Sequence, residues 1–135
     1  MRTIFALAAA AALWGCHGSD VAQKPRIQPD RTELGFGSEY GDAVFVGTRP
    51  QETLQLKNGG QDDLAVASVA VQGANGAVFT AVLDKQRVKS GETAFVAVTY
   101  APTASGSHSA QLVIASNAEN SPSLTIGLKG SAVTR

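Results

Sequence analysis

Residues 92–116 have the sequence ETAFVAVTYAPTASGSHSAQLVIAS, and this stretch decides the fold class. Apolar side chains alternate with small or polar ones on both sides of a short segment of small residues. Alternation with a period of two places one set of side chains on a buried face and the other toward water. The stretch therefore predicts two long β-strands joined as a central hairpin. The core residues expected in these strands are Val96, Val98, Tyr100, Ala110, Leu112 and Ile114.

The same alternation continues outside this stretch and is interrupted at regular intervals by turn residues. Turn centres fall near residues 58, 74, 90, 105 and 118. At the first centre, Asn58-Gly59-Gly60 contains residues that tolerate positive φ, so the chain is expected to turn there. The strand predicted over 64–71 changes its apolar phase, which indicates a bulge near Ala67-Ser68. These features predict an all-β, antiparallel, immunoglobulin-like sandwich of about seven strands.

Composition excludes several classes of function. The chain has 135 residues, with 11 Lys and Arg against 11 Asp and Glu, so it has no net charge that would draw it to nucleic acid. The single cysteine, Cys16, excludes an internal disulfide and a multi-cysteine zinc site. We therefore expect one folded domain over residues 25–135 and no nucleic-acid partner.

The N-terminus has the features of a secretory signal. Arg2 precedes an apolar run over residues 4–13, which is shorter than the roughly 20 apolar residues that a membrane-spanning helix needs. The next segment, Leu13-Trp14-Gly15-Cys16, resembles a bacterial lipobox, with Trp14 in place of the usual small residue. In lipoproteins of that kind, the leucine and the glycine are recognised in the signal peptide, and the cysteine is acylated after cleavage.

This resemblance divides the N-terminal part of the chain. It implies a cleaved lipoprotein signal peptide over 1–15, an acylated Cys16 and a flexible tether over 16–24. The membrane would then be bound through the lipid anchor, and the protein would lie at the cell envelope. His17 occupies the position beside the anchor where outer-membrane lipoproteins often lack an acidic residue, so the resemblance favours the outer membrane. The alternative is an ordinary signal peptide that is cleaved nearby and leaves Cys16 as a free thiol.

The folded part resembles ASH/hydin-type domains, which in bacteria occur in choice-of-anchor D proteins. The resemblance covers about residues 25–132 and depends on the order of many short signals rather than on one motif. Tyr100 stands where the family usually has phenylalanine, and Ala118-Glu119 where an acidic residue and proline are common. The resemblance implies a sandwich of the major-sperm-protein type that binds proteins or acts as a spacer, with no catalytic residue. The matching segments are Leu34-Gly35-Phe36-Gly37, 54–60, Phe79, Gly91, 98–102, Gly106, Ser116-Asn117 and Leu128-Lys129-Gly130.

One cluster of charge is a candidate binding edge. Lys85, Arg87 and Lys89 recur at every second residue, so an extended chain would place three cations on one side. Such a surface could contact phosphates of a lipid or an acidic partner. The competing interpretation is a solvated strand edge whose charges prevent unwanted strand pairing.

The other chemistry-bearing residues form no motif. A zinc site needs three or four converging ligands, and the only histidines are His17 and His108. Asp62-Asp63 lacks the spacing of a calcium loop. The sequence also contains no nucleophile elbow and no phosphate-binding glycine loop. We therefore expect neither a metal nor a cofactor, and we do not expect an enzyme.

Together these features predict a non-catalytic, lipid-anchored envelope protein that serves as a protein-interaction or structural module. Its partner is expected to be another envelope protein, which the sequence does not identify. The alternative is a domain that binds a small ligand or a glycan through loops at one end of the sandwich. That function would require aromatic side chains on these loops, and the candidates are Tyr40 and Phe45.

Overall fold

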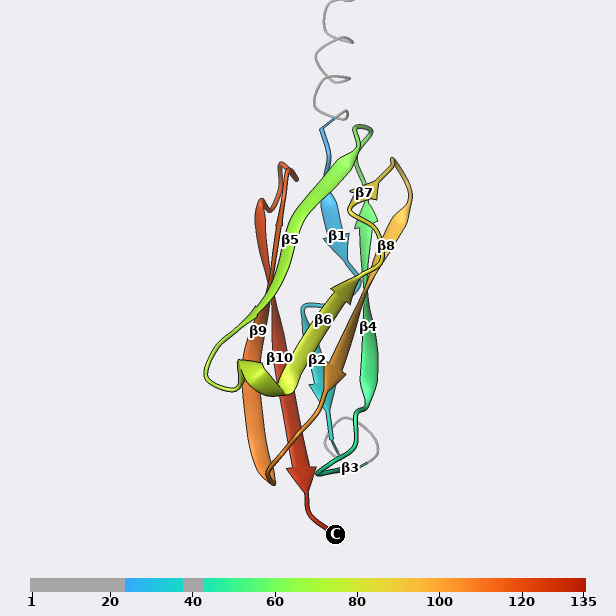
Figure 1. The fold of residues 1–135 in the computed structure, drawn as a ribbon. Helices are drawn as coiled ribbons and strands as arrows, with labels where there is room; N and C mark the ends of the chain where they lie inside the picture. Colours follow the sequence, from blue (N-terminus) through green and yellow to red (C-terminus); the bar gives the residue numbers. More distant parts are fainter. Residues whose placement is uncertain (1–23, 38–42) are drawn as a thin grey trace, which may run out of the picture.

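The computed structural model describes residues 24–37 and 43–135 (Figure 1). Its single helix in these residues has three residues, and no described helix is long and apolar enough to cross a membrane. The predicted signal peptide, including Leu13 and Gly15, lies outside the described residues, as do Cys16 and the tether up to residue 23. The elements are β1 (Ile27–Pro29), β2 (Glu33–Phe36), β3 (Val44–Phe45), β4 (Gln51–Asn58), β5 (Leu64–Gln72), η1 (Gly76–Val78), β6 (Phe79–Leu83), β7 (Arg87–Val88), β8 (Thr93–Tyr100), β9 (Gly106–Ser116) and β10 (Ser123–Val133).

The strands form two sheets that pack face to face. One sheet has the order β1-β4-β8-β6, and the other has the order β2-β10-β9-β5-β7, with β3 also paired to β10. Apolar side chains of the inner faces form one core between the sheets. The predicted all-β, immunoglobulin-like sandwich is therefore confirmed.

The structure adds two features to the predicted strand pattern. The strands β2 and β3 pair with β10 in parallel, one after the other along its length, while the other pairs are antiparallel. The strands β1, β3 and β7 have only two or three residues each. Alternation identifies a strand only over about four or more residues, so these short strands raise the number above the expected seven.

The central hairpin predicted for residues 92–116 is wrong in its pairing. The strand β8 pairs with β4 and β6, whereas β9 pairs with β10 and β5 in the opposite sheet. Their apolar faces belong to the same core, and all six predicted core residues are at most 8% exposed. Alternation shows which face of a strand is buried, but it is the same for paired strands as for strands stacked in two sheets.

The strand β5 contains the predicted bulge. Its register with β9 shifts between Val66 and Ser68, so Ala67 is an extra residue on β5. Before the bulge Val66 is buried, and after it Val69 packs against the core as a partly buried residue. The bulge therefore restores the inward direction of the apolar side chains after the phase change in the sequence.

Three aromatic rings pack together in the core. Their centroids lie 6.1 Å apart for Phe36 and Phe79, 5.4 Å for Phe36 and Tyr100, and 5.0 Å for Phe79 and Tyr100. Tyr100 is fully buried, and its hydroxyl hydrogen-bonds to Nδ1 of His108 at 2.5 Å. Burial raises the pKa of Tyr100, because desolvation disfavours the phenolate. Gly130 lies against the same ring, and a Cβ there would be 2.6 Å from Cζ of Tyr100.

Asn58, the last residue of β4, is the only buried polar residue in the described part of the chain. Its Oδ1 accepts hydrogen bonds from the backbone N–H groups of Gly60 (3.0 Å) and Arg26 (3.3 Å). Its Nδ2 donates to the carbonyl oxygens of Asp62 (2.7 Å) and Val88 (2.9 Å). One amide thus uses its full hydrogen-bonding capacity to join three segments of the chain.

The turn after Asn58 lies where the sequence predicts it, but the reason given for its glycines is wrong. Neither Gly59 nor Gly60 has a positive φ, and neither does Asn58. A Cβ at Gly60 would lie 1.8 Å from the carbonyl oxygen of Lys24, and one at Gly59 would lie 2.6 Å from Cδ of Gln28. Glycine is therefore required by the close approach of two chain segments rather than by the backbone angle.

Candidate functional site

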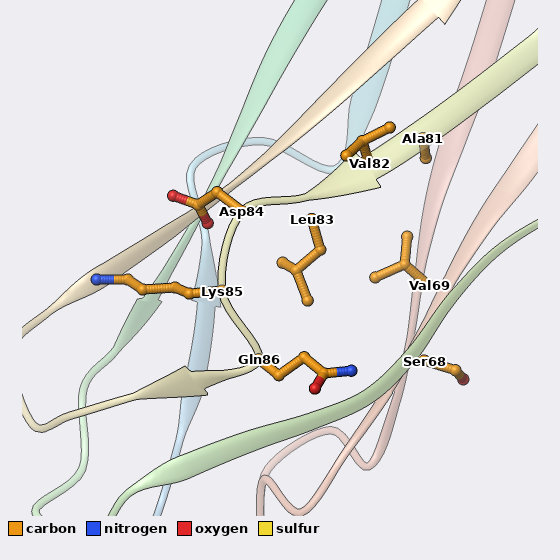
Figure 2. Close-up of a pocket in the computed structure, with 8 residues that line it drawn as sticks. All are labelled: Ser68, Val69, Ala81, Val82, Leu83, Asp84, Lys85 and Gln86. Atoms are coloured by element: carbon orange, nitrogen blue, oxygen red, sulfur yellow. The ribbon is translucent and has the colours of Figure 1, made fainter.

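An open cleft lies between the edges of β5 and β6, where the two sheets of the sandwich separate. It has a volume of about 560 Å³. Figure 2 shows Val69, Leu83 and Gln86 directed toward the space between the strands, while Asp84 and Lys85 point away from it. The lining residues are Ser68, Val69, Ala81, Val82, Leu83, Asp84, Lys85 and Gln86.

The strand β6 has a strand neighbour on one side only, namely β8. The N–H of Asp84 bonds to the carbonyl of Phe95 at 3.0 Å, and the N–H of Ala101 bonds to the carbonyl of Val78 at 2.7 Å. Hydrogen-bonded residues alternate in an antiparallel pair, so Thr80 and Val82 also bond to β8. The backbone groups of the intervening residues point away from β8. These residues are Phe79, Ala81 and Leu83, and among them the N–H of Phe79 is already bonded to the carbonyl of Gly76.

The facing strand β5 also presents an incomplete edge. Residues 66–72 of β5 pair with β9 on one side. On the other side β7 pairs only with Leu64 and Ala65, at the start of the strand, and the N–H of Val66 bonds to the carbonyl of Gln86 at 2.8 Å. The remainder of β5 lies beside β6 (Figure 1), and the cleft lies between the two strands. Two sheet edges with unused pairing capacity therefore border the same opening.

Apolar side chains extend this edge onto the outer face of the four-stranded sheet. Val82 on β6 is 67% exposed, and Phe95 on β8 is 42% exposed. Ala97 lies directly opposite Val82 in the register and shares a face with Phe95. The strand β6 thus has an apolar side chain exposed on its outer face as well as partly exposed ones toward the cleft.

The three predicted cations do not lie on one extended strand, although Lys85 and Lys89 both contact Glu92. Lys85 lies at the cleft and pairs with Glu92 at 3.6 Å, whereas Arg87 is on β7 and pairs with Asp63 at 3.3 Å. Lys89 is exposed, and its backbone N–H donates to Oε1 of Glu92 at 3.2 Å. The chain crosses from one sheet to the other between β6 and β7, so the continuous extended segment that would align the three side chains is absent from this described region.

The other residues considered from the sequence take part in structural contacts. His108 bonds to Tyr100, and Asp63 pairs with Arg87. In residues 24–37 and 43–135, no three His, Cys, Asp or Glu side chains lie close enough to hold a metal ion. Phe45 is covered by the guanidinium of Arg135, at 4.6 Å from the ring centroid.

Sequence reasoning missed the residues that make the β6 edge. Phe79-Thr80-Ala81-Val82-Leu83 contains no charge, and its apolar residues lie at both odd and even positions, so they point to both faces of the strand. That pattern is a signal for a strand with two apolar faces. Whether such a strand lies in the middle of a sheet or at its edge depends on long-range pairing, which the local pattern does not contain.

Comparison with solved structures supports the fold. A protein of unknown function from Porphyromonas gingivalis W83 has a TM-score of 0.68 and 22% identity, and the match covers 82% of this chain and 48% of that chain. The ASH/PapD-like domain 7 of human CEP192 has a TM-score of 0.60 and 17% identity over 83% of this chain and 88% of that one. The secreted serine protease VesC from Vibrio cholerae has a TM-score of 0.53 and 18% identity, over 84% of this chain and 24% of that one.

These comparisons place the chain beside parts of longer proteins. It spans about half the length of the Porphyromonas chain and a quarter of the protease chain. A search of curated proteins gave no match. The sequence over residues 25–131 matches the family described as HYDIN/CFA65/VesB-like, immunoglobulin-like domain. The chain therefore belongs to the HYDIN/CFA65/VesB-like family of immunoglobulin-like domains.

Proposed function

We propose that the protein is a non-catalytic, lipid-anchored component of the cell envelope whose immunoglobulin-like domain acts as a protein-interaction or structural module. Its family membership supports the interaction role. The observation that carries the proposal is the uncovered apolar edge at β6, where Val82 is 67% exposed beside an open cleft. Exposed Phe95 is a diagonal neighbour of Val82 on the same face of the sheet, and contiguous exposed apolar surface marks interaction sites.

The lipid anchor is supported by the sequence. Cys16 follows Leu13-Trp14-Gly15 in the lipobox-like segment. A single acyl chain holds a protein only weakly, whereas two or three chains make a stable anchor. The domain would then be held at the membrane, which we propose to be the outer membrane, and the segment after Cys16 would provide reach toward a partner.

Replacing Cys16 with alanine is expected to abolish palmitate labelling and to release the domain from membranes. The reason is that the thiol is the only acceptor for the diacylglycerol group in this chain. Labelling with radioactive palmitate, followed by membrane fractionation, measures both effects. A Cys16→Ala chain that is still labelled and sediments with membranes would rule out the anchor.

A photo-crosslinking residue at Val82 is expected to capture a specific protein in cells that express the anchored chain. The matched control places the same residue at Thr125, which is exposed on the outer face of the other sheet. A product from position 82 that is absent from position 125 supports an interaction at the β6 edge. The same product from both positions, or none from either, contradicts it. Specific retention on immobilised glycans without a protein product would instead favour the ligand-binding alternative.

A further inference from the structure

The strand β6 lacks the features that usually protect the edge of a sheet. Natural edge strands are kept short, carry charges or proline, or are covered by another segment. Among the other described edge strands, β1 has three residues and ends at Pro29, β2 carries the charged Glu33, and β3 and β7 have two residues each. In contrast, β6 has five residues without charge or proline, and the cleft beside it is open.

The charges next to β6 are already engaged. Oδ1 of Asp84 accepts a hydrogen bond from the N–H of Phe95 at 2.8 Å, and Lys85 pairs with Glu92 at 3.6 Å. Figure 2 shows the side chains of both Asp84 and Lys85 directed away from the cleft. An added charge buried in the cleft would have no partner there and would be disfavoured by its desolvation.

We propose that β6 receives an extended, uncharged segment of a partner protein as an added strand, with apolar side chains at every second position of that segment. Its backbone bonds to the outward N–H and C=O groups of Ala81 and Leu83, whereas the N–H of Phe79 is already bonded to the carbonyl of Gly76. One set of its side chains enters the cleft beside Val69 and Leu83. This mode of recognition combines backbone hydrogen bonds for affinity with side-chain pockets for specificity.

The geometry favours a partner segment over a second copy of this chain. If two β6 strands paired, their inner side chains, such as Leu83, would each face the cleft of their own domain, and both clefts would stay open. A five-residue edge pair also buries little surface compared with the roughly 1,200–2,000 Å² of a stable interface. An isolated segment can pair with β6 and fill the cleft at the same time.

This inference rests on the proposed interaction function, and a peptide probe tests it separately. The probe is Lys-Gly-Val-Thr-Val-Thr-Val-Gly-Lys, and its control is the same composition without alternation, Lys-Gly-Thr-Val-Val-Val-Thr-Gly-Lys. The protein is the full chain with Cys16→Ala, so that it is not acylated. Amide hydrogen exchange by NMR reports the pairing residue by residue.

The alternating probe is expected to slow exchange of the amides of Ala81 and Leu83 by about tenfold or more. The amides of Thr80 and Val82 bond to β8 and serve as internal controls whose exchange is unchanged. The control peptide is expected to have no such effect. Failure of the alternating probe to protect the amides of Ala81 and Leu83, or equal protection by both peptides, overturns the proposal. Protection that rises with protein concentration in the absence of peptide also overturns it, because the occupant would then be a second copy.

Three variants show whether binding occurs at the backbone edge. Ala81→Pro removes an N–H that does not bond to β8 and is expected to abolish protection of the Leu83 amide. Val82→Lys is expected to weaken binding by about tenfold, because an edge lysine opposes strand addition. Thr53→Lys is the matched control. Thr53 and Val82 both lie opposite Ala97 and on the same face of the sheet, but Thr53 is on the central strand β4. Equal loss in Val82→Lys and Thr53→Lys would contradict an edge site.

The two proposals fail in different ways. If position 82 captures a specific protein in cells but the probe protects no amide, the interaction module stands and strand addition is wrong. If position 82 captures nothing and the probe protects the amides of Ala81 and Leu83, the edge accepts strands but the cellular interaction function is wrong. Absence of both signals rejects both.

Discussion

Replacing Asn58 with alanine is expected to lower the free energy of unfolding by about 3–5 kcal/mol. The substitution removes four hydrogen bonds, of which those to the N–H of Gly60 and the carbonyl of Val88 are buried. Each buried group left without a partner costs about 1–3 kcal/mol. The groups of Arg26 and Asp62 are partly buried and can be hydrated more readily. Urea denaturation of the unacylated full chain measures the change.

Asn117→Ala is the matched control for this prediction. Asn117 also makes two hydrogen bonds between its side chain and the backbone, to Ala65 (2.8 Å) and Asp63 (3.3 Å), but both are exposed. Water can replace these bonds, so the expected cost is about 1 kcal/mol or less. An equal loss of stability in the two variants would show that burial of the Asn58 amide does not determine its contribution to the free energy of unfolding.

The local pattern predicted the strands and the bulge because both depend on which side chains face the core. The phase change between Val66 and Val69 marked the bulge, and the alternation around Val98 and Leu112 marked their burial. These inferences need only the chain itself and the two faces of a strand. They hold wherever a sheet has one face in the core.

The pairing of strands could not be predicted in the same way. A hairpin of β8 with β9 and the observed crossing between sheets both place Val98 and Leu112 in the core. Pairing is decided by the sum of long-range contacts, such as those of β8 with β4 and β6. The candidate site could not be predicted for the same reason. The edge of β6 is exposed because the chain crosses to the other sheet before Arg87.

Replacing Gly130 with alanine is expected to cost about 3 kcal/mol of stability, through overpacking rather than backbone strain. The added Cβ would lie 2.6 Å from Cζ of Tyr100 and 2.8 Å from both Cε atoms. The ring has little room to move, because Phe79 and Phe36 pack against it and its hydroxyl bonds to His108. The side chain that contacts Gly130 is fully buried, so the clash is with the core and not with solvent.

Gly127→Ala on the same strand separates this effect from a general intolerance of β10. The nearest atoms to a Cβ at Gly127 are Cγ and Oε2 of Glu33 at 3.7 Å, which is ordinary contact. Alanine is also preferred over glycine in a strand by roughly 0.5–1 kcal/mol, so Gly127→Ala is expected to be neutral or stabilising. A double-mutant cycle of Gly130→Ala with Tyr100→Leu is then expected to cost less than the sum of the single changes, because the smaller side chain removes the contact. Additive costs would show that the Tyr100 ring is not what requires glycine at position 130.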